Sequence, residues 1–254
     1  GTMKKILVLL VLFACVAVYA QKRVTVHAVY SEEVSMDASL SADCWQKAQK
    51  YPLHLCKYNM RDWPQSKRKN VGNKLRNPGY VQFLWNEKNL YIGVMMEDAD
   101  VVAEGQEDQL HHYQMGDTIE VFLKPRDRNF YWEMYGTPHQ KKTVFFYPGR
   151  ARLFVPSSAD HPVDISVTAA VDGTLNDWSD QDKGWSMIMA VPVEMLERKG
   201  YAFRPGQNWT VLVARQNFSA DLPLKEYSTH TPLPQVDFHL YEEYGDLILL
   251  PPAK

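Results

Sequence analysis

Three aspartates in one short stretch of the chain have the makings of a metal-binding loop. Asp177, Asp180 and Asp182 stand close together, and Gly184 follows them in a turn-rich segment. Calcium prefers several oxygen ligands supplied by a flexible loop, so this pattern predicts a structural calcium site. The spacing is not that of an EF-hand, and solvated acids in a turn are the competing interpretation.

Histidine and cysteine side chains are the next candidates for chemistry. His111 and His112 are adjacent, and neighbouring residues of an extended chain point in opposite directions, so we interpret them as loop histidines rather than metal ligands. In an exported protein Cys44 and Cys56 predict a single disulfide, with two buried free thiols as the alternative. They lack the C-x-x-C spacing, which leaves thiol redox chemistry and a zinc site without support.

Motifs of the common enzyme classes are absent from the sequence. It contains no G-x-S-x-G nucleophile elbow, no H-E-x-x-H, no P-loop and no G-x-G-x-x-G. Glycoside hydrolysis requires two carboxylates at a set separation, which sequence spacing does not reveal. We therefore expect no catalytic residues, and keep an unrecognised glycoside hydrolase as the alternative.

Strand patterns dominate the elements that would position these residues. Residues 117–124 alternate cleanly, which places Ile119, Val121 and Leu123 on one face of a strand and Glu120 on the other. Residues 80–85 and 90–96 flank a turn-like stretch and predict a hairpin. Further strands are predicted over 24–30, 130–135, 143–147, 165–171, 185–191, 209–215 and 247–250.

Helical signals are few. Asp43 is a candidate N-cap of a short helix, and residues 193–198 follow Pro192 as another. Many strands at short spacing with few helices predict an all-β sandwich or barrel. The polar, proline-bearing stretches 61–78 and 219–236 are interpreted as long loops, which often carry binding function on a β scaffold.

The N-terminus has the pattern of a cleavable signal peptide. Lys4 and Lys5 precede an apolar run over 6–18, and small residues before Gln21 offer a cleavage site. The run is too short to span a bilayer comfortably. A lipoprotein signal at Cys15 is a weaker interpretation, because bulky Phe13 fits it poorly. We expect residues 1–20 to be removed and the mature chain to reach the periplasm or the cell exterior without a membrane segment.

Composition narrows the classes of partner. The chain has 254 residues and a formal net charge of −2, and after the signal peptide it is long enough for one large all-β domain or two small ones. No basic stripe is present, so nucleic acid is not an expected partner. Aromatic residues are plentiful, with 7 Trp, 14 Tyr and 10 Phe.

Six segments, taken in order, resemble the family 9 carbohydrate-binding modules, in particular their secreted bacterial group. The resemblance covers nearly the whole mature chain and implies one DOMON-like β-sandwich, immunoglobulin-like or jelly-roll in type, over residues 21–254. The segments are Trp45 with Ala48; residues 81–93 with Glu97 and Asp98; 116–123; 172–176 with Asp180, Asp182, Gly184, Trp185 and 190–192; Trp209 with Arg215; and 244–247.

The resemblance also implies a sugar site. In that family two aromatic side chains hold a sugar ring while polar groups bond its hydroxyls. The first aromatic position falls at Gln114, which is not aromatic, although neighbouring Tyr113 could substitute; the second falls at Phe238. Glu120 and Arg215 match polar, sugar-contacting positions. A pyranose face can pack on an aromatic ring while its hydroxyls meet planar donors and acceptors.

Each of these residues also has a structural interpretation. Glu120 and Arg215 could form an ion pair, and Phe238 could pack in the core beside Leu240. The sugar hypothesis requires Glu120, Arg215 and Phe238 to converge on one solvent-open hollow.

We therefore expect a secreted, non-catalytic carbohydrate-binding protein that takes part in polysaccharide recognition or catabolism, with xylan as one candidate glycan. Its expected partners are a carbohydrate ligand and glycan-degrading enzymes, and calcium is the one cofactor considered. Two alternatives stay open. One is a glycoside hydrolase. The other is a haem-binding redox relative of the same sandwich, in which the haem would be held without covalent attachment because no C-x-x-C-H motif is present.

Overall fold

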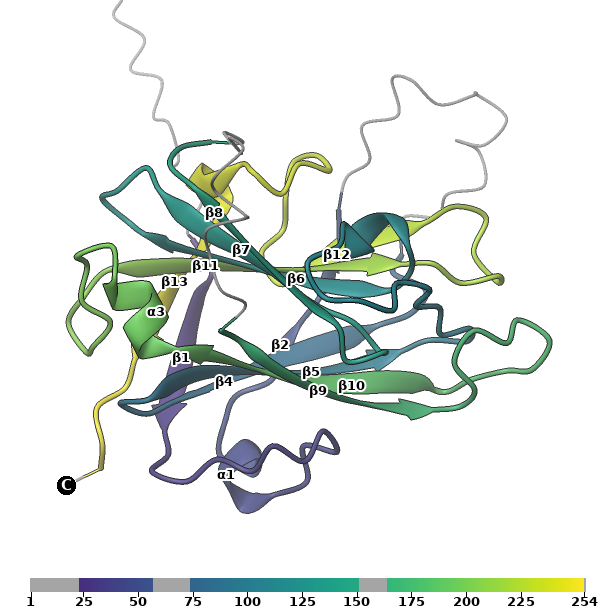
Figure 1. Ribbon diagram of the computed structural model, residues 1–254, viewed down its shortest axis with the longest axis horizontal. Helices are drawn as coiled ribbons and strands as arrows, with labels where there is room; N and C mark the ends of the chain where they lie inside the picture. Colours follow the sequence, from purple (N-terminus) through teal and green to yellow (C-terminus); the bar gives the residue numbers. More distant parts are fainter. Residues whose placement is uncertain (1–22, 57–73, 151–163, 254) are drawn as a thin grey trace, which may run out of the picture.

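Two β-sheets face each other in the computed structural model, which describes residues 23–56, 74–150 and 164–253 (Figure 1). Strand β1 (Thr25–Tyr30) joins them, because residues 25–28 pair with the upper sheet and residues 29–30 with the lower one. The upper sheet has the order β8 (Lys142–Tyr147), β7 (Tyr131–Gly136), β6 (Thr118–Pro125), β11 (Trp209–Asn217) and β13 (Gly245–Leu249), and β12 (Glu226–Thr229) and β3 (His54–Leu55) extend it beyond β11. The lower sheet has the order β4 (Gly79–Trp85), β5 (Asn89–Glu97), β10 (Gly184–Pro192) and β9 (Ser166–Asp172), with β2 (Tyr51–Pro52) beside β4. This arrangement confirms the all-β sandwich.

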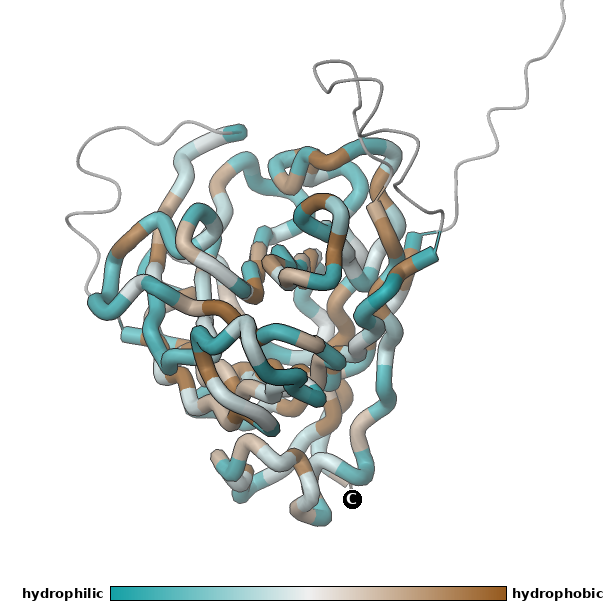
Figure 2. The backbone as a smooth tube through the Cα atoms, turned by 90° about the vertical axis from the view of Figure 1, so that its right-hand side faces the viewer, coloured by the Kyte–Doolittle hydropathy of each residue, from teal (hydrophilic) through white to brown (hydrophobic). Residues whose placement is uncertain are grey.

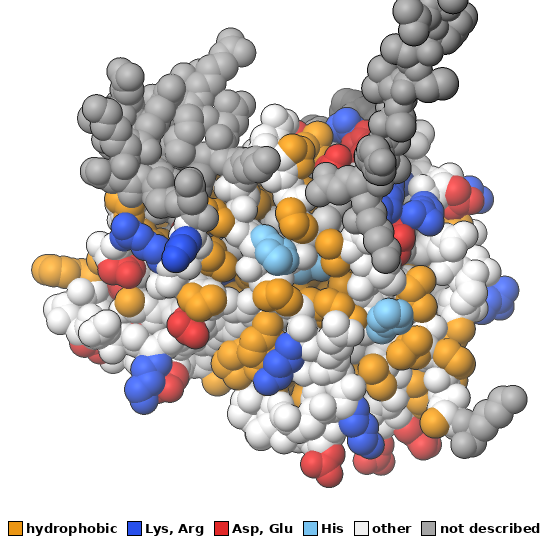
Figure 3. Space-filling view, turned by 180° about the vertical axis from the view of Figure 1, so that it is seen from behind, with side chains coloured by type: hydrophobic (Ala, Val, Ile, Leu, Met, Phe, Trp, Pro, Cys, Tyr) orange, Lys and Arg blue, Asp and Glu red, His pale blue; other side chains and the backbone are white. Residues whose placement is uncertain are grey.

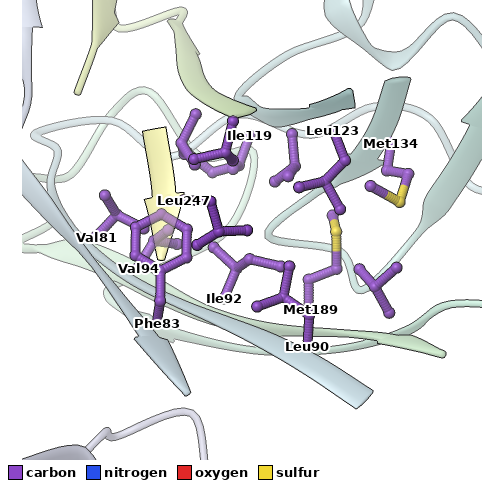
Figure 4. Packing of buried hydrophobic residues seen from close by; sticks show 14 of the residues in the cluster. Val81, Phe83, Leu90, Ile92, Val94, Ile119, Leu123, Met134, Met189 and Leu247 are labelled. Carbon is purple, nitrogen blue, oxygen red and sulfur yellow. The ribbon is translucent and has the colours of Figure 1, made fainter. Parts of the chain in front are cut away.

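The main core lies between the sheets. In Figure 4 the side chains of Phe83 and Ile92 from the lower sheet point toward Ile119, Leu123 and Leu247 from the upper one, and all of them are buried. Strand side chains alternate between the two faces of a sheet. Because the odd-numbered residues of β6 face this core, its even-numbered residues face outward, as the sequence pattern predicted.

The outer face of the lower sheet is covered by the short helix α1 (Asp43–Gln46) and the loop before it (Figure 1). Trp45 is fully buried there, and its ring occupies the space above Gly93. A Cβ on Gly93 would lie 2.7 Å from that ring, so glycine is what allows the helix to approach the sheet. The N-cap of α1 is Ala42 and not Asp43, which corrects the predicted cap. The second helix, α3 (Val193–Glu197), follows β10 at the predicted place.

The outer face of the upper sheet carries a second cluster of buried side chains, mainly aromatic ones. Phe122, Tyr131, Tyr135 and Tyr147 belong to it, and the segment between β12 and β13 lies over this face (yellow in Figure 1). Tyr244 anchors that segment by donating a hydrogen bond to the carbonyl of Phe238 at 2.7 Å. Figure 2 shows hydrophilic stretches mostly in the loops around the outside of the molecule.

Two further sequence predictions need correction, one about the stretch 219–236 and one about the disulfide. The stretch 219–236 is not wholly a loop, because it contains β12, which pairs with both β11 and β3. The disulfide is also wrong, since Cys44 and Cys56 are both free. Cys44 packs on the outer face of the lower sheet and Cys56 on that of the upper sheet, so the whole sandwich separates them. Burial raises the pKa of the Cys56 thiol to about 11.

The predicted signal peptide, Cys15 and most of the predicted loop 61–78 lie outside the described residues. Within the described part of the chain, no helix has the length and apolar character needed to cross a bilayer.

Candidate functional site

A hollow of about 540 Å³ opens on the outer face of the upper sheet. Its floor comes from neighbouring strands, namely Glu120 on β6, Glu133 and Tyr135 on β7, and Gln216 on β11. Its rim comes from the segment before β6, from residues 225–227 and from residues 236–239. The hollow therefore brings together segments that are far apart in sequence. Its floor forms because β6, β7 and β11 are adjacent and their outward-facing side chains point into it.

The floor is a buried polar network. Gln216 donates its amide N–H to Glu120, and the Tyr135 hydroxyl donates to Oε1 of Glu133 at 2.6 Å. Burial, followed by the neighbouring charge of Glu133, raises the pKa of Glu120 well above its usual range. Burial and the two glutamates likewise raise the pKa of Tyr135. Burial and the neighbouring carboxyl group therefore both favour the protonated form of Glu120.

Two acceptors on this floor have no protein partner. Oε2 of Glu133 and Oε1 of Gln216 are both buried and make no hydrogen bond within the described structure. A buried polar atom without a partner costs about 1–3 kcal/mol, so such atoms are uncommon and call for an explanation. Both atoms belong to residues that line the hollow, which makes a ligand with hydrogen-bond donors a natural partner.

Aromatic rings form the walls. The ring centroids of Tyr227 and Phe238 lie 6.2 Å apart, with 69° between the ring planes. Tyr113 lines the rim of the hollow. The ammonium of Lys225 donates to the carbonyl of Tyr113 at 2.7 Å and lies 4.1 Å from the ring centre of Phe218. Burial lowers the pKa of Lys225 to about 8. The walls thus offer flat apolar surface beside one cation.

Histidines complete the lining. The ring of His111 stacks on Phe145, with the centroids 5.4 Å apart, and Nδ1 of His239 lies 2.7 Å from the Tyr131 hydroxyl. Figure 3 shows, from behind, histidine side chains surrounded by hydrophobic ones on the molecular surface. The neighbouring His112 is buried and not part of the lining, as expected if adjacent residues point apart.

Four of the residues expected to contact a sugar line this hollow. Glu120 lies on the floor, Phe238 on the wall, and Tyr113 and Gln114 on the rim, where the Gln114 amide donates to the Tyr113 hydroxyl at 2.8 Å. Phe238 also packs against Phe122, so it combines core packing with exposure to the hollow. The contact of these residues with a sugar stays a prediction.

Arg215 does not lie in the hollow, so the expected convergence of Glu120, Arg215 and Phe238 is wrong: only Glu120 and Phe238 line the hollow. Arg215 is completely buried and faces the interior, where it pairs with Asp98 at 2.9 Å and donates to the carbonyl of Asn77 at 2.7 Å. The proposed ion pair with Glu120 is also wrong. The register pairs Arg215 with Ile119, so Arg215 and Glu120 point to opposite faces of the sheet.

The three aspartates of the predicted calcium loop do not converge. Asp182 is buried and accepts the backbone N–H groups of Val101 and Thr174, while Asp177 accepts from Ser179. Within the described ranges, no group of three histidine, cysteine or acidic side chains is placed to hold a metal ion. Asp182 instead ties two loops together.

The sequence reasoning missed Glu133, Tyr135, Gln216, Lys225 and Tyr227. Two of them carried a detectable signal, because Glu133 and Tyr135 alternate with the apolar Trp132 and Met134 along β7. A strand with an apolar face toward the core and a polar, aromatic face away from it is typical of a site built on the outside of a sheet. Lys225 and Tyr227 lay in a stretch interpreted as a loop.

Solved structures share this architecture. A proposed carbohydrate-binding protein from Bacteroides uniformis matches with a TM-score of 0.64 and 10% identity, covering 90% of this chain and 100% of that one. Family 9 carbohydrate-binding modules from Caldicellulosiruptor kristjanssonii in complex with cellotriose and with glucose match with TM-scores of 0.61 and 0.58, each at 10% identity and covering 90% of this chain and 95% and 97% of theirs. No family model matches the sequence, and no curated protein matches it. The chain therefore has the β-sandwich fold found in family 9 carbohydrate-binding modules.

Proposed function

We propose that this protein is an exported, non-catalytic carbohydrate-binding protein whose ligand occupies the hollow on the outer face of the upper sheet. One observation carries the proposal: two unpartnered buried acceptors, on Glu133 and Gln216, lie at the base of a hollow walled by aromatic rings. The basic and apolar N-terminal residues support export.

A sugar satisfies both halves of this arrangement. Its C–H faces pack on the rings of Phe238, Tyr227 or Tyr113, and its hydroxyls donate to the two acceptors below. The raised pKa of Glu120 favours its protonated form, in which the carboxyl beside them can also donate a hydrogen bond.

The glutamate pair supports binding rather than hydrolysis. Catalytic carboxyl groups of glycosidases flank the scissile bond, about 5–5.5 or 6.5–9.5 Å apart depending on the mechanism. Glu120 and Glu133 lie on adjacent strands and on one face of one sheet, where Glu120 is opposite Tyr135 and Glu133 is opposite Phe122. Glu120 accepts a hydrogen bond from Gln216 and Glu133 accepts one from Tyr135, so the protein's own groups already hold both carboxyls, as suits a floor that binds rather than cleaves.

The wider role follows from the same chemistry. We propose that the protein recognises a polysaccharide or its fragments and hands them to glycan-degrading enzymes. Xylan fragments are one candidate ligand. Cellotriose and glucose are natural first probes, because they occupy modules of the same fold.

The test is a glycan array followed by calorimetric titration of the sugars that bind. We expect saturable binding that Phe238→Ala weakens about tenfold, the value of one aromatic contact of about 0.5–1.5 kcal/mol. Glu120→Gln is expected to weaken it as well, because one acceptor oxygen becomes an NH2 group, which donates hydrogen bonds but cannot accept one. Glu32→Gln, an exposed glutamate far from the hollow, is the matched control and should bind normally. The absence of binding to any plant, host or microbial glycan on the array would contradict the proposal.

A further inference from the structure

A second, smaller hollow of about 310 Å³ lies on the same outer face of the upper sheet. Its lining differs in charge from that of the first, with four basic side chains, namely Arg23, Lys124, Arg126 and Arg128, against two acidic ones. The first hollow has the opposite balance, because the acidic side chains of Glu133 and Asp237 outnumber its one lysine even without Glu120. Charge therefore changes sign along this face.

The two hollows are neighbours. Glu120 and Lys124 both face outward on β6, four residues apart, which places their backbones about 13 Å apart along the strand. Tyr131 lies between them, since its hydroxyl meets His239 at 2.7 Å and its ring centre is 5.9 Å from that of Tyr241. His239 lines the first hollow and Tyr241 the second, so one short segment borders both.

Lys124 is the unusual group in the second hollow. Its residue is only 5% exposed, yet no carboxylate in the described structure lies within ion-pair distance of its ammonium. The ammonium donates to the backbone carbonyls of Pro125 and Arg126 and lies 4.8 Å from the centre of the Tyr241 ring. An ammonium has three donors, so one remains for a ligand.

The electrostatics of this lysine favour an added negative charge. Burial, and then the nearby charge of Arg23, lowers the pKa of Lys124. A buried charge without an ionic partner is unfavourable, and an anion beside it would offset that cost. Arg126 and Arg128 already pair with Asp246 and Asp127, but both stay about half exposed and can share their remaining N–H groups.

We propose that the second hollow is a subsite for an acidic substituent, a carboxylate or a sulfate, on a glycan whose neighbouring unit occupies the first hollow. This inference rests on the proposed sugar-binding function and narrows its ligand to acidic oligosaccharides. Guanidinium groups and an ammonium around one opening suit such an anion, because charge-assisted hydrogen bonds to it are short and strong.

The test compares each acidic oligosaccharide with its own neutral form. Galacturonate and glucuronate oligosaccharides are titrated beside their carboxyl-reduced counterparts, and sulfated ones beside their desulfated counterparts. We expect at least one acidic form to bind about tenfold more tightly than its neutral form, with the difference shrinking as salt rises. Lys124→Gln should remove the difference and leave the affinity for the neutral form unchanged.

Controls keep the outcomes separable. Lys88→Gln removes the same charge from an exposed turn and should preserve the difference. If the Lys124→Gln variant unfolds, a double variant, Arg23→Gln with Arg128→Gln, tests the same subsite, because both arginines are partly exposed. Equal binding of acidic and neutral forms by the native protein would overturn the subsite and leave the sugar-binding function standing. Failure of every form to bind would overturn both.

Discussion

Replacing Arg215 by methionine is expected to lower the free energy of unfolding by about 3–5 kcal/mol, the usual cost of removing one partner from a buried ion pair. The guanidinium is completely buried and contacts Asp98 at 2.9 Å and the carbonyl of Glu97 at 2.8 Å. Asp117 lies close enough that the charges of Asp98 and Arg215 both shift its pKa. Without the cation, two buried carboxyl groups lose the charge that stabilises their ionised forms.

Denaturant unfolding with Arg204→Met as the matched control measures this effect, because Arg204 is exposed. The loss should shrink in acid. Without Arg215, the folded-state pKa of Asp98 would rise further above its unfolded value, so the folded variant takes up a proton and regains stability as pH falls. Sugar affinity of the folded variant should be unchanged. A variant of native stability with lost sugar binding would mean that Arg215 contacts the ligand after all.

Replacing Gln216 by leucine is expected to weaken sugar binding about 100-fold, or about 2.7 kcal/mol. Leucine keeps most of the side-chain volume but removes the unpartnered Oε1 acceptor and the amide that holds Glu120. A ligand hydroxyl then loses its partner, and the buried Glu120 carboxyl loses a donor. Each such loss costs about 1–3 kcal/mol.

Calorimetry on the folded variant checks this effect, with Gln181→Leu as the control because Gln181 is exposed in the loop before β10. Thermal unfolding should confirm that both variants are folded at the titration temperature. Unchanged affinity in Gln216→Leu would show that the floor of the hollow does not contact the sugar, and that binding depends on the rim alone.

Much of the fold is predictable because period-two alternation is strong in this chain. The pattern of Ile119, Val121 and Leu123 against Glu120 gave the inward and outward faces of β6 correctly, and the structure bears them out. Strand β12 was not predicted, because its residues, Glu226, Tyr227, Ser228 and Thr229, have no apolar face and lie among prolines. Its pairing with β11 and β3 decides its conformation, and no local pattern reports such a contact.

The site was only partly predictable. The family resemblance assigned both Glu120 and Arg215 to one pocket by their positions in the sequence. Alternation instead places Arg215 with Trp209, Val211 and Val213 on the inner face of β11. This alternation is visible in the sequence and indicates that the Arg215 side chain faces the interior. The closeness of Glu120 and Glu133 depends instead on which strands lie side by side, since the two residues come from β6 and β7. Strand order is a tertiary property that alternation cannot supply.

The disulfide prediction was wrong for a related reason. Cys44 and Cys56 are near in sequence, and the predicted export would favour oxidation, yet the chain between them crosses from one outer face of the sandwich to the other. Sequence distance says little about spatial distance when strands β2 and β3, which join different sheets, lie in between.

A crystal structure of the protein with the oligosaccharide that binds most tightly tests the central claim most directly. The account predicts a sugar ring against Phe238 or Tyr227, with hydroxyls donating to Oε2 of Glu133 and Oε1 of Gln216. A sugar bound elsewhere, for example on the 77% exposed Trp178, with the hollow of Glu133 and Gln216 left empty, would contradict it.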